Sequence, residues 1–104
     1  MPRITYVATR QERFEPGKNY PVSYVQRVIT LDYSPLGDEV TINVVGVMQP
    51  KHARIIGDDG RILKYKDTTN PMFTYEIETR PSDNTIVRVS IFVGGLGIEY
   101  RYSN

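Results

Sequence analysis

One histidine and three glutamates are the side chains of this sequence best suited to acid–base chemistry. His52 is the single imidazole, and a general base needs a positioned nucleophile or carboxylate that its sequence neighbours do not supply. Glu76, Glu78 and Glu99 could form the paired carboxylates of a glycosidase, which stand about 5–9.5 Å apart in a cleft. Alternation along extended segments also explains these glutamates as the solvated face of two strands. We therefore expect no catalytic residues and no enzyme.

Two glycine-containing stretches would bind ligands only in the right surroundings. Residues 57–60 (GDDG) hold two adjacent carboxylates, but calcium loops alternate their oxygen ligands and add a later bidentate glutamate. Residues 94–97 (GGLG) lead into the strand-like residues 98–102 (IEYRY), whereas a dinucleotide-binding loop leads into a helix. Both stretches are typical of hairpin loops, because Asp and Gly tolerate left-handed backbone. We expect no metal site and no cofactor.

Eight tyrosines with interleaved arginines are the most suggestive feature of the sequence. Buried rings packed in a sheet would explain many of them, while exposed rings favour protein interfaces, sugar stacking or base stacking. Arg101 lies between Tyr100 and Tyr102. Arg88 lies on the preceding strand-like segment, and Phe14 is the one apolar residue of a polar stretch. These five residues form our predicted protein interface, so Tyr102→Ala or Arg101→Glu should weaken association and leave folding intact.

A β-hairpin over residues 85–102 is the clearest structural element that could position these side chains. Side chains of a strand alternate between its two faces. The first arm (TIVRVSIFV) therefore places a fully aliphatic set on one side, namely Val87, Val89, Ile91 and Val93. The glycine-rich loop after it supplies the positive φ that tight hairpin loops need. The aliphatic set predicts a core face, on which a charged substitution should unfold the domain.

Similar alternation predicts strands along most of the remaining chain. The predicted segments are residues 4–9, 22–33, 39–48, 52–56, 61–66 and 72–79. Residues 10–20 lack periodicity and contain a Pro-Gly turn, so we expect a solvated loop there. No convincing helical stripe occurs. The sequence predicts an all-β fold, an antiparallel β-sandwich or small β-barrel of about seven or eight strands joined by hairpins, in one domain over residues 1–104.

Composition restricts the partners and the compartment. The 104 residues include no cysteine and carry a net charge of +1. A disulfide framework is therefore excluded, and a nucleic-acid partner, whose binding surface usually shows a basic surplus, is not expected. No apolar run reaches the roughly 18 residues of a membrane span, and the N-terminus has no hydrophobic signal region. We expect a soluble protein with no secretion signal and no membrane partner.

The function that these patterns favour is non-enzymatic assembly through protein–protein contacts, with copies of itself or within a larger particle. In size, lack of cysteine and all-β makeup the chain resembles small accessory proteins of tailed-phage heads and tails, and that resemblance implies a structural role as a virion component. Two alternatives stay open. A carbohydrate-binding β-sandwich module needs coplanar exposed tyrosines, and a small-barrel nucleic-acid-binding protein needs Arg27, Arg88 and Arg101 on one face.

Overall fold

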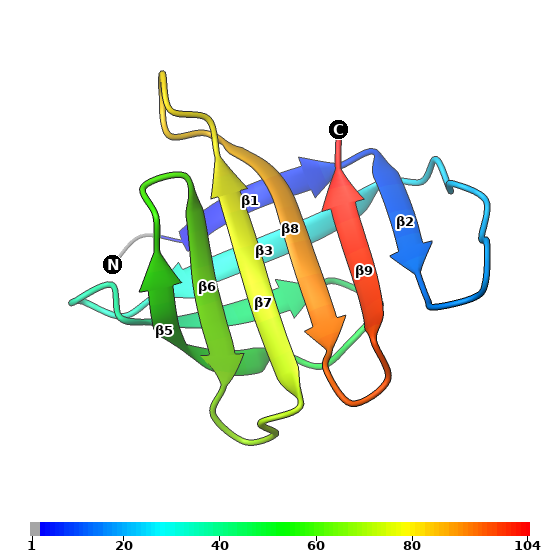
Figure 1. Cartoon of the computed structure of the whole chain (residues 1–104). Coiled ribbons are helices and arrows are strands. Elements are labelled where there is room, and N and C mark those ends of the chain that lie inside the picture. The colour runs from blue at the N-terminus through cyan, green and yellow to red at the C-terminus, as the bar shows by residue number, and fades with distance from the viewer. Residues whose placement is uncertain (1–2) are drawn as a thin grey trace.

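The computed structural model describes residues 3–104, which form nine antiparallel strands in one nearly closed, barrel-like sheet (Figure 1). The strands are β1 (Arg3–Ala8), β2 (Arg10–Phe14), β3 (Arg27–Tyr33), β4 (Glu39–Val44), β5 (Lys51–Asp58), β6 (Ile62–Asp67), β7 (Phe73–Thr79), β8 (Ile86–Val93) and β9 (Ile98–Ser103). Their order in the sheet is β1-β3-β4-β5-β6-β7-β8-β9-β2. The all-β prediction is confirmed, as a barrel rather than two packed sheets, and no helix occurs within the described residues.

The sheet closes because one stretch of chain crosses from one of its edges to the other. β1 and β2 are separated only by Thr9, yet β1 pairs with β3 and β2 pairs with β9. The Thr9 backbone N–H donates to the Ser103 carbonyl (3.0 Å), and the Tyr6 hydroxyl donates to the Val87 carbonyl (3.0 Å). These bonds bridge β1 to β8 and β9, and they reduce the open sheet edge that could recruit foreign strands.

The barrel interior is filled by the inward-pointing residues of the strands, as expected for a small barrel. Its fully buried members include Ile29, Leu31, Val40, Ile42, Val44, Tyr65, Tyr75, Ile77, Val89 and Tyr102. Large aromatic side chains thus supply much of the apolar area that stabilises the fold. The aliphatic face predicted for the hairpin over residues 85–102 is confirmed at its centre, where Val89 and Ile91 are buried, while Val87 and Val93 towards the ends of β8 are half-buried.

One charged side chain, Asp67, is buried in this interior and is fully hydrogen-bonded. One carboxylate oxygen accepts from the Tyr75 hydroxyl (2.7 Å), and the other accepts from the backbone N–H groups of Thr69 and Asn70 (2.8 Å each). Burial acts to raise the pKa of Asp67, but the Asn70 N–H, the Tyr75 hydroxyl and the Thr69 N–H, with the nearby charge of Lys51, bring the pKa below its usual value. The carboxylate therefore stays ionised and fixes the turn after β6.

The prediction of a solvated loop over residues 10–20 is wrong in its first half, where β2 forms. The inward positions of β2 are Gln11 and Arg13, so the strand lacks the apolar alternation that would have revealed it. The main-chain hydrogen bonds with β9 do not require an apolar pattern, and the Arg27 guanidinium donates through Nε to the Gln11 amide oxygen (3.1 Å). β2 is therefore specified by its partners rather than by its own pattern.

The strand predicted over residues 22–33 is shorter than expected and begins at Arg27. The preceding residues leave the barrel wall and meet β2 only through the bridge between Gln11 and Ser23. Tyr24 in this segment has 77% of its surface exposed, the highest value among the tyrosines that are exposed. The β-rich composition of the segment thus reflects residues that run along the end of the barrel, outside the sheet.

Candidate interaction surfaces

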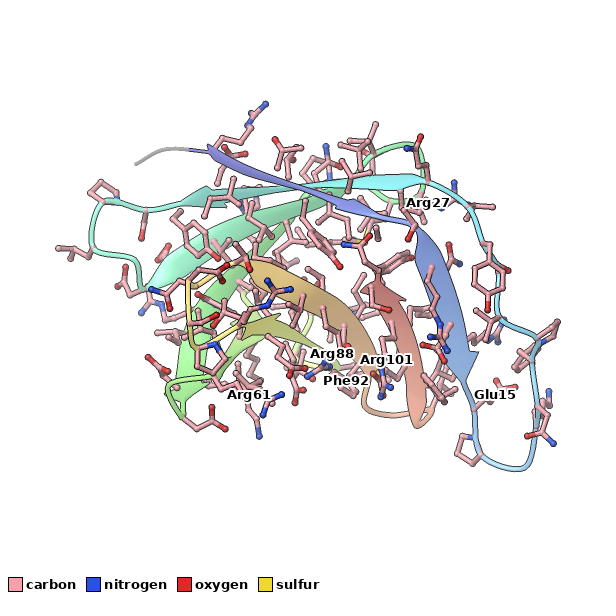
Figure 2. All side chains as sticks on the ribbon, turned by 90° about the horizontal axis from the view of Figure 1, so that it is seen from above. Glu15, Arg27, Arg61, Arg88, Phe92 and Arg101 are labelled. Carbon is pink, nitrogen blue, oxygen red and sulfur yellow. The ribbon has the colours of Figure 1, made fainter. Side chains whose placement is uncertain are left out.

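The five residues predicted as one interface lie on opposite faces of the barrel wall. Tyr100 and Tyr102 point inward, and Tyr102 is only 2% exposed. Arg88, Arg101 and Phe14 point outward from three neighbouring strands, and Figure 2 shows Arg88 and Arg101 close together on the outside of β8 and β9. The alternation of side chains along β9 separates Arg101 from both tyrosines. The structure therefore brings together three of the five residues.

Arg88 is the centre of an ion-pair network on this outer face. Its Nε donates to Glu78 (2.9 Å) and one terminal nitrogen donates to Glu76 (3.2 Å). The other terminal nitrogen donates to the buried Ser90 hydroxyl and lies 3.9 Å from Glu99. Only 14% of the Arg88 side chain is exposed. The Arg88 guanidinium is thus paired with side chains of its own sheet. Its three carboxylate partners are the glutamates that the sequence offered as catalytic acids.

This network favours the ionised form of Glu78. The hydrogen bond from Arg88 lowers the pKa of Glu78 against the opposing effect of burial, and the nearby charge of Arg61 lowers it further. A glycosidase acid needs a pKa that is raised, so that it holds a proton near neutral pH. In this arrangement Glu78 serves as a salt-bridge partner.

Arg101, on the same outer face, is also paired with side chains of its own sheet. Its Nε donates to Glu99 (2.9 Å), and its guanidinium carbon lies 4.5 Å from the centre of the Phe14 ring, a cation–π stack between β9 and β2. Phe14 remains 40% exposed beside it. The charge of Arg101 is thus balanced by Glu99 on the same strand, and the plane of its guanidinium is covered by Phe14 on a neighbouring strand. A partner carboxylate would have to compete with Glu99 for it.

The loop after β2 is fastened by Glu15, which lies at its start (Figure 2). The Glu15 carboxylate accepts from the Tyr20 hydroxyl (2.7 Å) and forms salt bridges with Arg13 and Lys18 (3.3 Å each). The Arg13 guanidinium carbon lies 4.6 Å from the Tyr20 ring centre and 5.6 Å from that of Tyr100. Tyr20 therefore anchors the loop, although 38% of its surface is exposed.

The outer face of β1, β3 and β4 lies on the opposite side of the barrel (Figures 1 and 2). The residues in its two central rows are uncharged. Val7 pairs with Val28, and the Val45 N–H donates to the Val28 carbonyl (2.9 Å), so the three valines form a row across the strands. They are 40%, 38% and 50% exposed in that order. The next row is polar and uncharged, consisting of Thr5, Thr30 and Asn43. We call these six residues the valine face.

The valine face was not predicted from the sequence, although the sequence holds a signal for it. Val7, Val28 and Val45 each stand on the polar side of their strand's alternating pattern, where an isolated valine is ordinary. Only the register between strands shows that the three lie in one row. Single exposed apolar residues need no explanation, but adjoining ones mark candidate interaction surfaces.

The barrel also opens into a pocket with a volume of about 390 Å³. Its lining residues come from five strands and the β4–β5 turn, namely Gln11, Val47, Met48, Lys51, Phe73, Ile91, Val93, Tyr100 and Tyr102. We call it the mouth pocket. It is mostly apolar with a few polar groups, which is the usual makeup of a small-molecule site.

The remaining candidates from the sequence take part in local structure. His52 is exposed, and its Nδ1 lies 3.0 Å from the Thr41 hydroxyl on the paired strand. Asp58 accepts from the Gly60 N–H (2.8 Å), and Asp59 accepts from the N–H groups of the two residues after Gly60 (3.0 and 2.7 Å). Both carboxylates thus shape the β5–β6 hairpin loop. Within residues 3–104, no three His, Cys, Asp or Glu side chains are grouped as metal ligands.

The arginines named for nucleic-acid binding do not share a face. Arg27, the first residue of β3, lies across the barrel from Arg88 and Arg101 (Figure 2). Among the tyrosines of residues 3–104, only Tyr20 and Tyr24 are exposed. A stacking platform of several tyrosines is therefore not formed on the described surface.

Comparisons with other proteins leave the surfaces themselves as the guide to function. No model of a protein family, no curated protein and no solved structure matches this chain. No helix in the described part of the chain is long and apolar enough to span a membrane.

Proposed function

We propose that this domain is a non-enzymatic assembly protein that associates with copies of itself through the valine face. The observation that supports the proposal most is the row of Val7 on β1, Val28 on β3 and Val45 immediately after β4, whose side chains adjoin and remain about two-fifths to one-half exposed. Water is excluded from such a row when a second apolar surface covers it, and the gain is about 25 cal/mol per Å² of apolar area.

The chemistry of the valine face favours a second copy as the partner. An interface around a two-fold axis places the same patch of both subunits in contact, so the patch must be complementary to itself. The two central rows carry no charge, and like charges would therefore not oppose each other there. The salt bridge between Arg3 and Asp32 (2.8 Å) lies at the far end of the same strands, where it would form part of a polar rim.

Sedimentation of the protein over a wide range of concentration tests this proposal. We expect mass to increase with concentration and Val28→Glu to abolish the increase, because the substitution places an unpaired charge at the centre of the contact. Leu36→Glu is the matched control, since Leu36 is 89% exposed in a turn away from the valine face. Circular dichroism verifies folding. A wild-type protein that remains monomeric at the highest concentration would refute self-association.

The setting that we propose for such a role is a tailed-phage head or tail, as a virion component. The support for this setting is the chain length, the lack of cysteine and the all-β fold. Copies arranged by a symmetric contact are the ordinary building material of such particles.

A further inference from the structure

We propose that the mouth pocket is a binding site for a small carboxylic acid with an apolar body. This inference is independent of self-association, because the pocket shares no lining residue with the valine face. Its volume of about 390 Å³ lies within the roughly 300–1,000 Å³ that ligand pockets span. The pocket therefore has room for a compact molecule.

The walls of the pocket suit an apolar body. Phe73 comes from β7, and Ile91 and Val93 come from β8, while Met48 and Val47 belong to the β4–β5 turn. Ile91 is only 6% exposed, so the pocket reaches the barrel core. The thioether and the ring can adapt to either a flat or a linear hydrocarbon group.

The one charged side chain that lines the pocket indicates the charge of the ligand. Among the described residues that line it, Lys51 is the only charged one. The Lys51 ammonium lies 5.9 Å from the centre of the Phe73 ring and takes part in none of the salt bridges formed within residues 3–104. Asp67 lies near enough for the charge of Lys51 to help lower its pKa. The Asp67 carboxylate accepts from the Tyr75 hydroxyl and from the backbone of its own turn, and it forms no salt bridge with Lys51 within the described residues. The three N–H donors of the ammonium are therefore available to a ligand.

The neutral polar groups of the pocket add further donors. The Gln11 side-chain oxygen already accepts from Arg27 (3.1 Å), which leaves the NH₂ group of Gln11 as a donor. Tyr100 and Tyr102 also line the pocket, and a tyrosine hydroxyl is a hydrogen-bond donor. A carboxylate accepts hydrogen bonds through both oxygens and pairs with an ammonium, whereas an amine would place a second positive charge near Lys51.

Titration with 4-phenylbutyrate, followed by amide and methyl NMR shifts, tests this proposal. We expect saturable shifts that cluster on the β4–β5 turn and on the pocket-lining residues of β8 and β9. The uncharged analogue 4-phenylbutanamide should bind about tenfold more weakly, because it cannot form the charged pair with Lys51. This comparison uses the unaltered protein, so it does not depend on how any variant folds.

Variants then assign the charge. Lys51→Met keeps the aliphatic stem and should reduce phenylbutyrate affinity about tenfold while leaving the affinity for the amide unchanged. Lys66→Met, on the exposed face of β6, should change neither. Equal affinity for acid and amide in the wild type, shifts outside the pocket, or no saturable binding would each overturn the proposal. None of these results bears on self-association, which sedimentation measures separately.

Discussion

The two outer faces of this barrel differ in how their side chains are already engaged. On β7, β8 and β9, Arg88 and Arg101 are paired with glutamates of the same sheet, and Arg101 is also stacked on Phe14. On β1, β3 and β4, Val28 and its two neighbours adjoin one another and are left half-covered. The presence of arginine and tyrosine therefore does not by itself indicate a binding surface. Such side chains can bind a partner only where the fold has not already buried them or paired them with other residues.

Tyr102→Ala gives the largest expected effect, because Tyr102 belongs to the core and not to a surface. Removing a buried aromatic side chain leaves a cavity and should lower the free energy of unfolding by about 3–5 kcal/mol. Tyr24→Ala, at a residue that is 77% exposed, should change it by less than about 0.5 kcal/mol. Urea unfolding measures both. Equal, small losses would show that Tyr102 is at the surface and that the inner face of β9 is misassigned.

Arg88→Met tests whether the charged face is structural. Methionine retains the apolar stem, but the glutamates around position 88 lose their shared cation, so we expect a loss of about 1–3 kcal/mol. Arg3→Met is the control, because the salt bridge of Arg3 with Asp32 is exposed and should contribute nothing measurable. If Arg88→Met and Arg3→Met have equally small effects in urea unfolding, the network does not stabilise the fold and its charges are free to bind a partner.

Acid should destabilise the barrel through Asp67 and Glu78. Both have a pKa below the usual value in the folded state, so the unfolded state takes up protons first as the pH falls. Their contribution to stability is complete above the unfolded pKa of about 4 and is lost as the pH falls through the lower folded pKa. Asp67→Asn should therefore flatten the dependence of the urea midpoint on pH below about 4. An unchanged dependence would contradict the assignment.

Periodicity predicted the parts of the fold whose two faces differ in polarity. The β8–β9 hairpin alternates strictly and was recovered with its inward residues, of which Val89 and Ile91 are buried. β2 was missed because Gln11 and Arg13 point inward from it, and strand pairing does not appear in the pattern of a single segment. The candidate surfaces depend on register: only the pairing across strands gathers the glutamates around Arg88 and aligns Val28 with its neighbours.

Sedimentation of Val28→Glu and of Arg101→Gln at the same high concentration shows which of the two outer faces mediates association. If the valine face is the contact, Val28→Glu should sediment as a monomer, because a buried unpaired charge opposes association. Arg101→Gln should associate as the wild type does, because Arg101 is already paired with Glu99. Loss of association in Arg101→Gln with association retained in Val28→Glu would contradict the account and place the contact on the charged face.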